Sequence, residues 1–274
     1  MSRPAEEAKA ARLLIALKCS QRIFKYALIP LHFKNFFEYG GLGERIVSHR
    51  MQGVDEMVEQ FLPASTAGKT NVEVEALRRQ YLSGMEDFTR QEVSEYLPIL
   101  YNQALVMIIT VFDGFFSESL TTITNKYPQY LKSMADDKDI TIMQIIDLAD
   151  YSAIFERIQS RVIKRFDYKS ITERLDVLRK LGVNVDDALR FKFHRAQTQQ
   201  KYPESLKLLR SYYEKRNSIV HQEQPAFDTY EQLEAAGEFF SDLVLSLGFA
   251  LGFKFDVMTD FETMFARHAQ RPRT

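Results

Sequence analysis

The chain of 274 residues contains no tryptophan and only one cysteine, Cys19. A single thiol cannot form an internal disulfide, and it cannot supply the several cysteines of a thiolate zinc site. The absence of a disulfide framework favours a reducing compartment, and we expect a cytoplasmic protein. The chain also has only 11 glycines and 8 prolines. Because these residues interrupt helices, their scarcity favours long helices over many short strands.

The chain also has no large excess of either charge, because 36 lysines and arginines are balanced by 37 aspartates and glutamates. Without a basic field over the whole molecule, a nucleic acid would have to be held by a local patch. Long uninterrupted apolar runs are rare as well. Leu105–Phe116 is short and contains Asp113, and Phe239–Phe255 is interrupted by Asp242 and Lys254. We therefore expect no membrane-spanning segment, and the short apolar run near the N-terminus does not resemble a signal peptide.

Apolar residues recur at helical spacing along most of the chain, and no stretch alternates as a strand does. The expected helices cover about residues 5–29, 44–62, 72–96, 98–126, 142–166, a short segment ending at 181, 185–200, 203–221 and 229–255. The glycine-rich segments lack the spacing of phosphate-binding loops, so no cofactor is expected. We predict an all-α protein: an up-and-down helical bundle over residues 98–274, preceded by an N-terminal helical extension over residues 1–97.

The segment 98–126 is apolar on nearly all sides, which predicts a helix at the centre of the bundle. Asp113 and Ser117 are exceptions, one helical turn apart. A buried carboxylate without a partner is strongly destabilising, so Asp113 needs a cation or a hydrogen-bond donor. Gly114 beside it would allow a second helix to approach closely.

The most basic segment lies between residues 157 and 180. It contains Arg157, Arg161, Lys164, Arg165, Lys169, Arg174, Arg179 and Lys180, interspersed with Glu156, Asp167, Glu173 and Asp176. A solvated helix face with some ion pairs explains this composition at least as well as an RNA-binding patch does.

The stretch most suggestive of chemistry places Arg216, Asn217 and His221 near the end of a predicted helix, before Pro225. At about 100° per residue, Asn217 and His221 lie about 40° apart on one face, whereas Arg216 and His221 are separated by about 140°. Arginine and histidine therefore converge only if the helix end unwinds or a second chain completes the site. Cations also stabilise ordinary helix ends, so spacing alone favours a structural role. None of the five histidines has a second ligand at zinc-binding spacing, so no metal is expected.

The order of these features resembles the HEPN superfamily (higher eukaryotes and prokaryotes nucleotide-binding domains). An apolar helix carrying the isolated Asp113 is followed by further helices, then by Arg216-Asn217 and His221, and then by one more apolar helix. The family consists of small helical bundles, and many members are RNases of toxin and anti-phage systems. Their signature is an arginine, often followed directly by asparagine, with a histidine a few residues later. The resemblance covers roughly residues 98–255 and leaves the N-terminal segment unexplained.

This resemblance implies a metal-independent endoribonuclease of the toxin or antiviral defence type. His221 would transfer protons at the ribose 2′-hydroxyl and the leaving oxygen, and Arg216 would stabilise the phosphate charge. Asn217 would orient the phosphate or the histidine, and Asp113 would hold Arg216. Further substrate contacts are expected from Lys215, Tyr212 and Glu118. The expected partners are RNA, a second copy of the chain in a two-fold dimer, and an antitoxin or other regulatory protein.

A second function class is open. In a non-catalytic HEPN-like module, the same residues would form a buried polar network that fixes helix packing. The protein would then act by binding a partner protein or a nucleotide.

Overall fold

The computed structural model describes residues 3–65, 68, 70–134, 151–190, 202–222 and 224–255. Within these ranges the chain is almost entirely helical and contains no strand, so the predicted all-α class is confirmed. The helices are α1 (Arg3–Glu38), α2 (Leu42–Ser65), α3 (Asn71–Ser94), α4 (Tyr96–Lys126), α5 (Gln129–Met134), α7 (Tyr151–Asp167), α8 (Ile171–Lys180), α9 (Val185–Arg190), α10 (Tyr202–Gln222) and α11 (Tyr230–Lys254).

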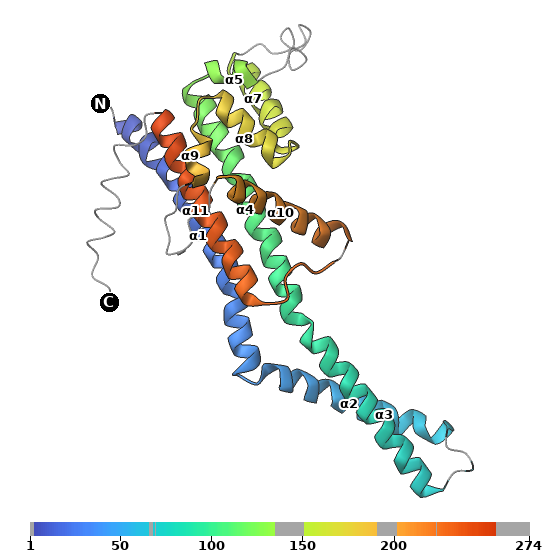
Figure 1. Ribbon diagram of the computed structural model, residues 1–274. Coiled ribbons are helices and arrows are strands. Elements are labelled where there is room, and N and C mark those ends of the chain that lie inside the picture. Colours follow the sequence, from blue (N-terminus) through green and yellow to red (C-terminus); the bar gives the residue numbers. More distant parts are fainter. Residues whose placement is uncertain are drawn as a thin grey trace.

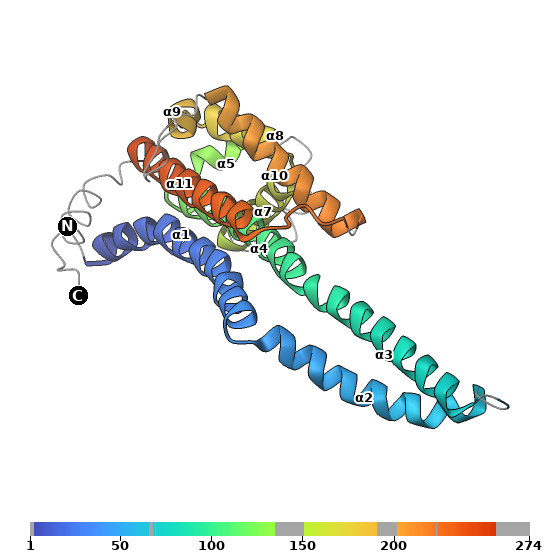
Figure 2. The same ribbon diagram turned by 60° about the horizontal axis from the view of Figure 1, so that its bottom comes forward.

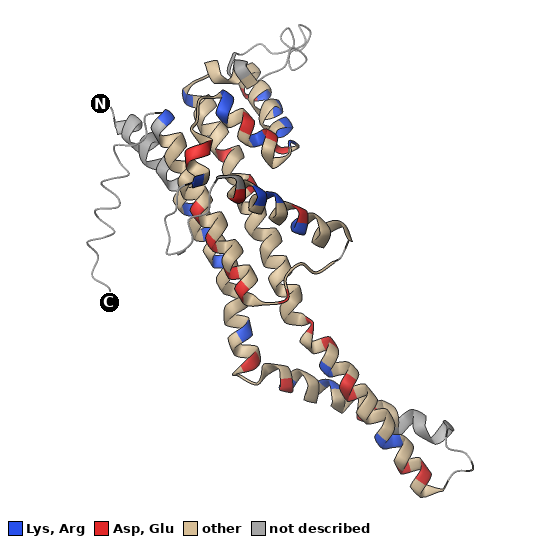
Figure 3. Cartoon of the chain, viewed as in Figure 1, with Lys and Arg blue, Asp and Glu red and all other residues tan. Residues whose placement is uncertain are grey.

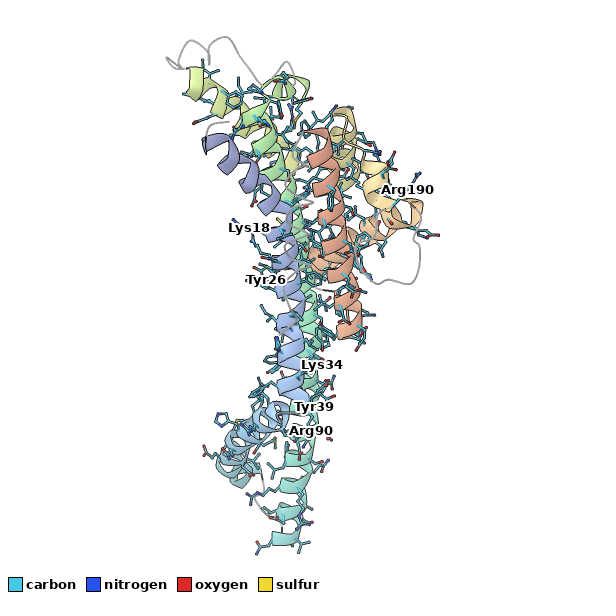
Figure 4. All side chains as sticks on the ribbon, turned by 90° about the vertical axis from the view of Figure 1, so that its left-hand side faces the viewer. Lys18, Tyr26, Lys34, Tyr39, Arg90 and Arg190 are labelled. Carbon is cyan, nitrogen blue, oxygen red and sulfur yellow. The ribbon has the colours of Figure 1, made fainter. Side chains whose placement is uncertain are left out.

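The molecule is elongated and consists of a helical bundle and a projecting arm (Figure 1). Helices α1, α4 and α11 lie side by side along the bundle, with α5, α7, α8 and α9 around one end and α10 against α4. Helices α2 and α3 form the arm, an antiparallel pair that leads away from the bundle (Figure 2). Viewed from the side, α1 descends past Lys18, Tyr26 and Lys34 to Tyr39, where the arm begins (Figure 4).

Helix α4 is the centre of the bundle, as its apolar sequence predicts. Its largest fully buried side chains include Phe112, Phe115 and Phe116. The Phe112 ring packs edge-on against Phe116 and against Phe240 of α11, with ring centroids 5.0 and 5.1 Å apart. Each buried aromatic ring removes a large apolar area from water, so these contacts dominate the stability of the bundle.

Helix α1 belongs to the same core, so the predicted division at residue 97 is not the division seen in the fold. Cys19 and Ile23 of α1 are buried with the side chains of α4 and α11. The Ser20 hydroxyl also hydrogen-bonds the buried Ser241 hydroxyl of α11 at 2.6 Å. Helix α1 was expected to end before Pro30, yet it continues to Glu38 with the buried Pro30 inside it. Tertiary packing here outweighs the local preference of proline, and only α2 and α3 extend outward.

Exposed ion pairs and a helix cap are found on the arm. Arg90 of α3 contacts Glu44 of α2 at 2.8 Å and Glu86 at 2.9 Å, and charges of both signs alternate along the arm (Figure 3). Thr70 and Glu73 form a capping box that begins α3, as residues of these types do at helix N-termini. Exposed ion pairs contribute little stability, so the arm depends mainly on its packed apolar face.

Two helical stretches are long and apolar enough to cross a membrane by length and composition alone: 71–126, where α3 continues into α4, and 230–252 in α11. The sequence-based expectation of no such segment was therefore too strict. In their most apolar windows, 56% and 61% of the residues are buried inside the structure. Core helices of bundles pass the same test, and burial against α1 accounts for the apolar character of both.

Two glycines of α11 allow α1 to pack closely. A Cβ atom added at Gly248 would lie 2.6 Å from Cβ of Ala16, and one at Gly237 would lie 2.9 Å from Cβ of Ala27. The close helix approach predicted at Gly114 is wrong, because a Cβ atom there would meet nothing within 4 Å. The small residues that matter for packing are therefore in α11.

We expect Gly248→Ala to lower the free energy of unfolding by about 1–2 kcal/mol, the range for overpacked helix contacts. The loss should occur although alanine is the better helix former by about 1 kcal/mol. Gly84→Ala in α3 is the matched control, because a Cβ atom there meets nothing within 4 Å and should stabilise the helix. Urea denaturation measures both variants. The pair Gly248→Ala and Ala16→Gly should recover part of the loss, and an unchanged Gly248→Ala variant would contradict the close packing of α1 on α11.

Candidate functional site

The residues of the Arg-Asn-x-x-x-His stretch lie on the last turns of α10. The helix packs on α4 through buried Leu209 and Tyr212, and its C-terminal end projects to one side of the bundle (Figures 1 and 2). Asn217 and His221 are exposed on this projecting end, and Arg216 is half-buried. The predicted grouping of Asn217 and His221 on one helix face follows from the unbroken helix.

Arg216 and Asn217 are joined directly. Nη1 of Arg216 donates a hydrogen bond to Oδ1 of Asn217 at 3.0 Å. Nε of Arg216 is buried and has no hydrogen-bond partner within the described part of the chain. A buried donor without a partner costs stability, so this nitrogen is a local destabilising feature of the α10 end. His221 likewise makes no hydrogen bond or ion pair with any other described residue, and it is exposed to solvent.

Asp113 does not contact Arg216, and that prediction is wrong. Oδ1 of Asp113 instead accepts hydrogen bonds from Nη1 of Arg174 and from the Tyr213 hydroxyl, each at 2.5 Å. Arg174 comes from the first turns of α8, and only 8% of its side chain is exposed. The lone acid of the central helix did need a cation, but the one that satisfies it is buried on α8.

All three guanidinium nitrogens of Arg174 donate hydrogen bonds. Its Nε donates to the backbone oxygen of Lys169 at 3.0 Å, and its Nη2 donates to the backbone oxygen of Asp167. Ser117, one turn after Asp113, donates to the Asp167 carboxylate at 2.5 Å. We call Asp113, Arg174 and Tyr213 the polar triad. The triad ties α4, α8 and α10 together and thereby fixes the helix that carries Arg216.

The triad also affects Tyr213. Burial, followed by the negative charge of Asp113 and the hydrogen bond to it, raises the pKa of Tyr213 well above its usual value. The positive charges of Arg174 and Arg216 oppose that rise. Arg216 therefore lies close enough to the triad to act on it electrostatically, although it forms no bond with Asp113. The neutral phenol remains a hydrogen-bond donor at physiological pH.

The three predicted substrate contacts fall in three different environments. Tyr212 is only 6% exposed and its ring centroid lies 5.5 Å from those of Phe239 and Phe240, so its side chain lies in the core and not on the exposed face of α10. Burial raises the pKa of Tyr212 to about 12. Lys215 is half-buried, and its Nζ lies 4.9 Å from the Phe227 ring centroid, a cation–π contact.

Glu118, the third predicted contact, is exposed on α4 and faces α1. There its charge adds to the effect of burial in raising the pKa of Cys19 to about 11. About 140° of helix rotation separates Glu118 from Asp113, so the two carboxylates lie on different sides of α4. The structure therefore does not bring Glu118 to the end of α10.

Asn102 is a site-positioning residue that the sequence analysis missed. Its Oδ1 accepts hydrogen bonds from the backbone nitrogens of Ala226 and Phe227 at 2.7 and 3.0 Å. Its Nδ2 donates to the Phe227 backbone oxygen at 2.8 Å, and the side chain is buried. These bonds fasten the segment after α10 to the central helix. The signal was the same as for Asp113, a lone polar residue in an apolar helix.

The end of α10 offers a cation, an amide and an imidazole. No group of three or more histidine, cysteine or acidic side chains suited to a metal ion occurs among the described residues. A guanidinium can neutralise an anionic oxygen, and an exposed imidazole can accept or donate a proton near neutral pH. The available chemistry is therefore proton transfer next to an anion.

We expect a strong energetic coupling between Asp113 and Arg174 and none between Asp113 and Arg216. Removing one partner of a largely buried ion pair leaves the other uncompensated, so Asp113→Asn and Arg174→Met should each cost about 3 kcal/mol. In a double-mutant cycle this pair should show a coupling energy of about 1–3 kcal/mol, measured by urea denaturation. The matched cycle of Asp113→Asn with Arg216→Met should show less than about 0.5 kcal/mol. The reverse order of coupling energies would contradict the triad.

Comparisons of the chain with protein-family models, with curated proteins and with solved structures found no match. The fold class therefore rests on the helices themselves. The likeness to HEPN proteins rests on the order of Asp113, Arg216, Asn217 and His221 along the chain. The function has to be argued from the geometry of the α10 end.

Proposed function

We propose that the protein is a metal-independent endoribonuclease with an HEPN-like bundle, acting at the projecting end of α10. The observation that carries the proposal is the arrangement there. Arg216 is hydrogen-bonded to Asn217, and the exposed His221 follows one turn later on the same face as Asn217. An exposed amide and an exposed imidazole on one face, with a guanidinium bonded to the amide, suit a phosphodiester substrate once a second chain supplies the opposing arginine.

His221 is the proton-transfer group in this proposal. The imidazole accepts the proton of a ribose 2′-hydroxyl, and the resulting oxygen forms a bond to the adjacent phosphorus. The bond from phosphorus to the 5′-oxygen breaks, and that oxygen takes a proton from the protonated His221 imidazole, which returns to its neutral form. The products are a 2′,3′-cyclic phosphate and a 5′-hydroxyl. Because the nucleophile is already attached next to the phosphorus, no metal-activated water is required.

Arg216 and Asn217 position and neutralise the phosphate. The Arg216 guanidinium is half-buried and bonded to Asn217, and a guanidinium can neutralise a phosphate oxygen. Asn217 Oδ1 already accepts from Arg216, which leaves its Nδ2 free to donate to the substrate. Asp113 acts only indirectly in this scheme, by fixing Tyr213 and hence α10.

The proposed active unit is a two-fold dimer. Arg216 and His221 lie about 140° apart around α10, so one chain directs them to different sides. If two α10 ends face each other, the arginine of one chain can complement the histidine of the other. A cytoplasmic RNase of this kind would also need restraint, so an antitoxin or other regulatory protein belongs to the same proposal.

One observation favours the alternative, a non-catalytic module that binds a partner protein or a nucleotide. Oδ1 of Asp113 accepts hydrogen bonds from both Arg174 and Tyr213, as expected of a network that fixes helix packing. Val220, next to His221, is 47% exposed and offers an apolar contact. In that case the α10 end would be a docking surface.

We expect the wild-type protein to cleave RNA in excess EDTA, leaving 2′,3′-cyclic phosphate ends, and to leave DNA intact because DNA lacks the 2′-hydroxyl. His221→Ala should reduce cleavage by about 10²–10⁴-fold, the usual contribution of a general acid or base. Since the side chain is exposed, its loss should change the free energy of unfolding by less than about 0.5 kcal/mol. Gel analysis of fragment ends and thermal unfolding measure these effects. Inhibition by EDTA or 3′-hydroxyl products would contradict the mechanism.

A mixing experiment tests the two-chain site. Arg216→Ala and His221→Ala should each be inactive alone, whereas an equimolar mixture should regain about a quarter of wild-type activity. Half of the dimers in the mixture then contain one intact arginine–histidine pair. Sedimentation of the wild type supplies the control for dimer formation. A mixture as inactive as its components would contradict the two-chain site, and a wild type without activity on any RNA would favour the binding module.

A further inference from the structure

Helix α7 has an inward and an outward face of very different composition. Gln159, Val162 and Phe166 are buried, and Gln159 Nε2 hydrogen-bonds the Thr124 hydroxyl of α4 at 2.8 Å. On the opposite side lie four residues within about 60° of one another at 100° per residue. We call these four residues the basic stripe: Arg157, Arg161, Lys164 and Tyr168. The stripe extends about 17 Å along the helix.

The charge of the basic stripe is of one sign. The nearest acids on the helix, Glu156 and Asp167, lie to one side of it, and the Asp167 carboxylate accepts a hydrogen bond from Ser117. Arg157 and Lys164 are exposed and form no ion pair among the described residues. On the arm, by contrast, cations such as Arg50 and Arg90 contact acids of the neighbouring helix. Exposed cations paired with acids therefore occur on the arm, whereas Arg157 and Lys164 have no such partner among the described residues.

The stripe ends at an exposed aromatic ring. Tyr168 is 80% exposed, which is unusual for a side chain whose burial would stabilise the fold. Its neighbour Ser170 caps α8 through a capping box with Glu173, so the backbone around the ring is well fixed. An exposed ring on a fixed backbone beside a row of cations can stack with a base while the cations bind phosphates.

The stripe leads toward the candidate site on α10. Thr172, at the start of α8, accepts a hydrogen bond from Nε of Arg210 at 3.2 Å, which places α10 beside the end of α7. Lys207, Arg210, Asn217 and His221 lie within about 80° of one another around α10, and all four are exposed. Cations of α7 and α10 are both visible in Figure 3. Glu214 is the one acid on that face of α10.

We propose that the basic stripe and the exposed face of α10 form one track that binds single-stranded RNA and delivers it to His221. Arg157 and Lys164 bind phosphates, Tyr168 stacks on a base, and Arg210 continues the phosphate contacts onto α10. This inference rests on the proposed RNase function for its direction toward His221. Because stacking needs an unpaired base, the track selects single strands over duplexes.

Binding of a labelled 2′-O-methyl oligouridylate of about 20 nucleotides, which cannot be cut by 2′-hydroxyl attack, tests the track without cleavage. Fluorescence anisotropy should show that Arg157→Glu with Lys164→Glu weakens binding of the full chain about tenfold or more and flattens its salt dependence. Arg45→Glu with Arg79→Glu makes the same change of net charge on the exposed arm and should leave binding within about twofold. Tyr168→Ala should weaken binding about fivefold or more, and Tyr168→Phe, which keeps the ring, should not.

The outcomes separate this inference from the proposed function. If the stripe variants lose binding but unmodified RNA is not cut by the wild type, the track stands and the RNase proposal fails. If RNA is cut and the stripe variants bind like the wild type, the track alone is overturned. Equal losses in the arm and stripe variants, equal binding of a duplex, or binding to phosphatidylserine vesicles but not to the oligonucleotide would also overturn it.

Discussion

The buried ion pair between Arg174 and Asp113 is the interaction on which the arrangement of the bundle around α4 depends. It removes two charges from water, and the cost is recovered only because Arg174 also satisfies two backbone oxygens and Asp113 also accepts from Tyr213. Apolar contacts could be made in several helix orientations, whereas these bonds can be made in one. The pair therefore determines where α8 begins and which face α10 turns toward solvent.

The sequence predicted the helices better than it predicted their partners. The apolar pattern of 98–126 was enough to identify the central helix, because a helix that is buried on all sides is apolar on all sides. Asp113 was correctly expected to need a partner, but eight cations between residues 157 and 180 look alike in sequence. Only the backbone path distinguishes Arg174, which turns inward, from Arg157 and Lys164, which do not. Tyr212 was assigned to substrate because of its neighbours, although its position on α10 directs it into the core.

Two kinds of positive charge follow from this difference. Arg174 is buried and donates hydrogen bonds from all three guanidinium nitrogens, so it serves the fold, whereas Arg157 and Lys164 of α7 face water. The near-zero net charge does not reveal this difference between buried and exposed cations, because acids in both the arm and the bundle offset the positive charge of the whole chain. Local distribution, rather than total charge, is what a polyanion would encounter.

The continuity of α3 and α4 has a mechanical consequence. Glu95, between them, keeps a helical backbone with φ −77° and ψ −14°, so the outward helix continues directly into the buried one (Figure 1). The stretch of 56 residues is about 84 Å long. Tyr81 and Phe88 are exposed on α3. The direction of their side chains relative to the bundle therefore depends on the number of residues between them and the buried part of α4. One residue inserted into α3 would turn both rings by about 100° relative to the bundle while leaving the bundle itself unchanged.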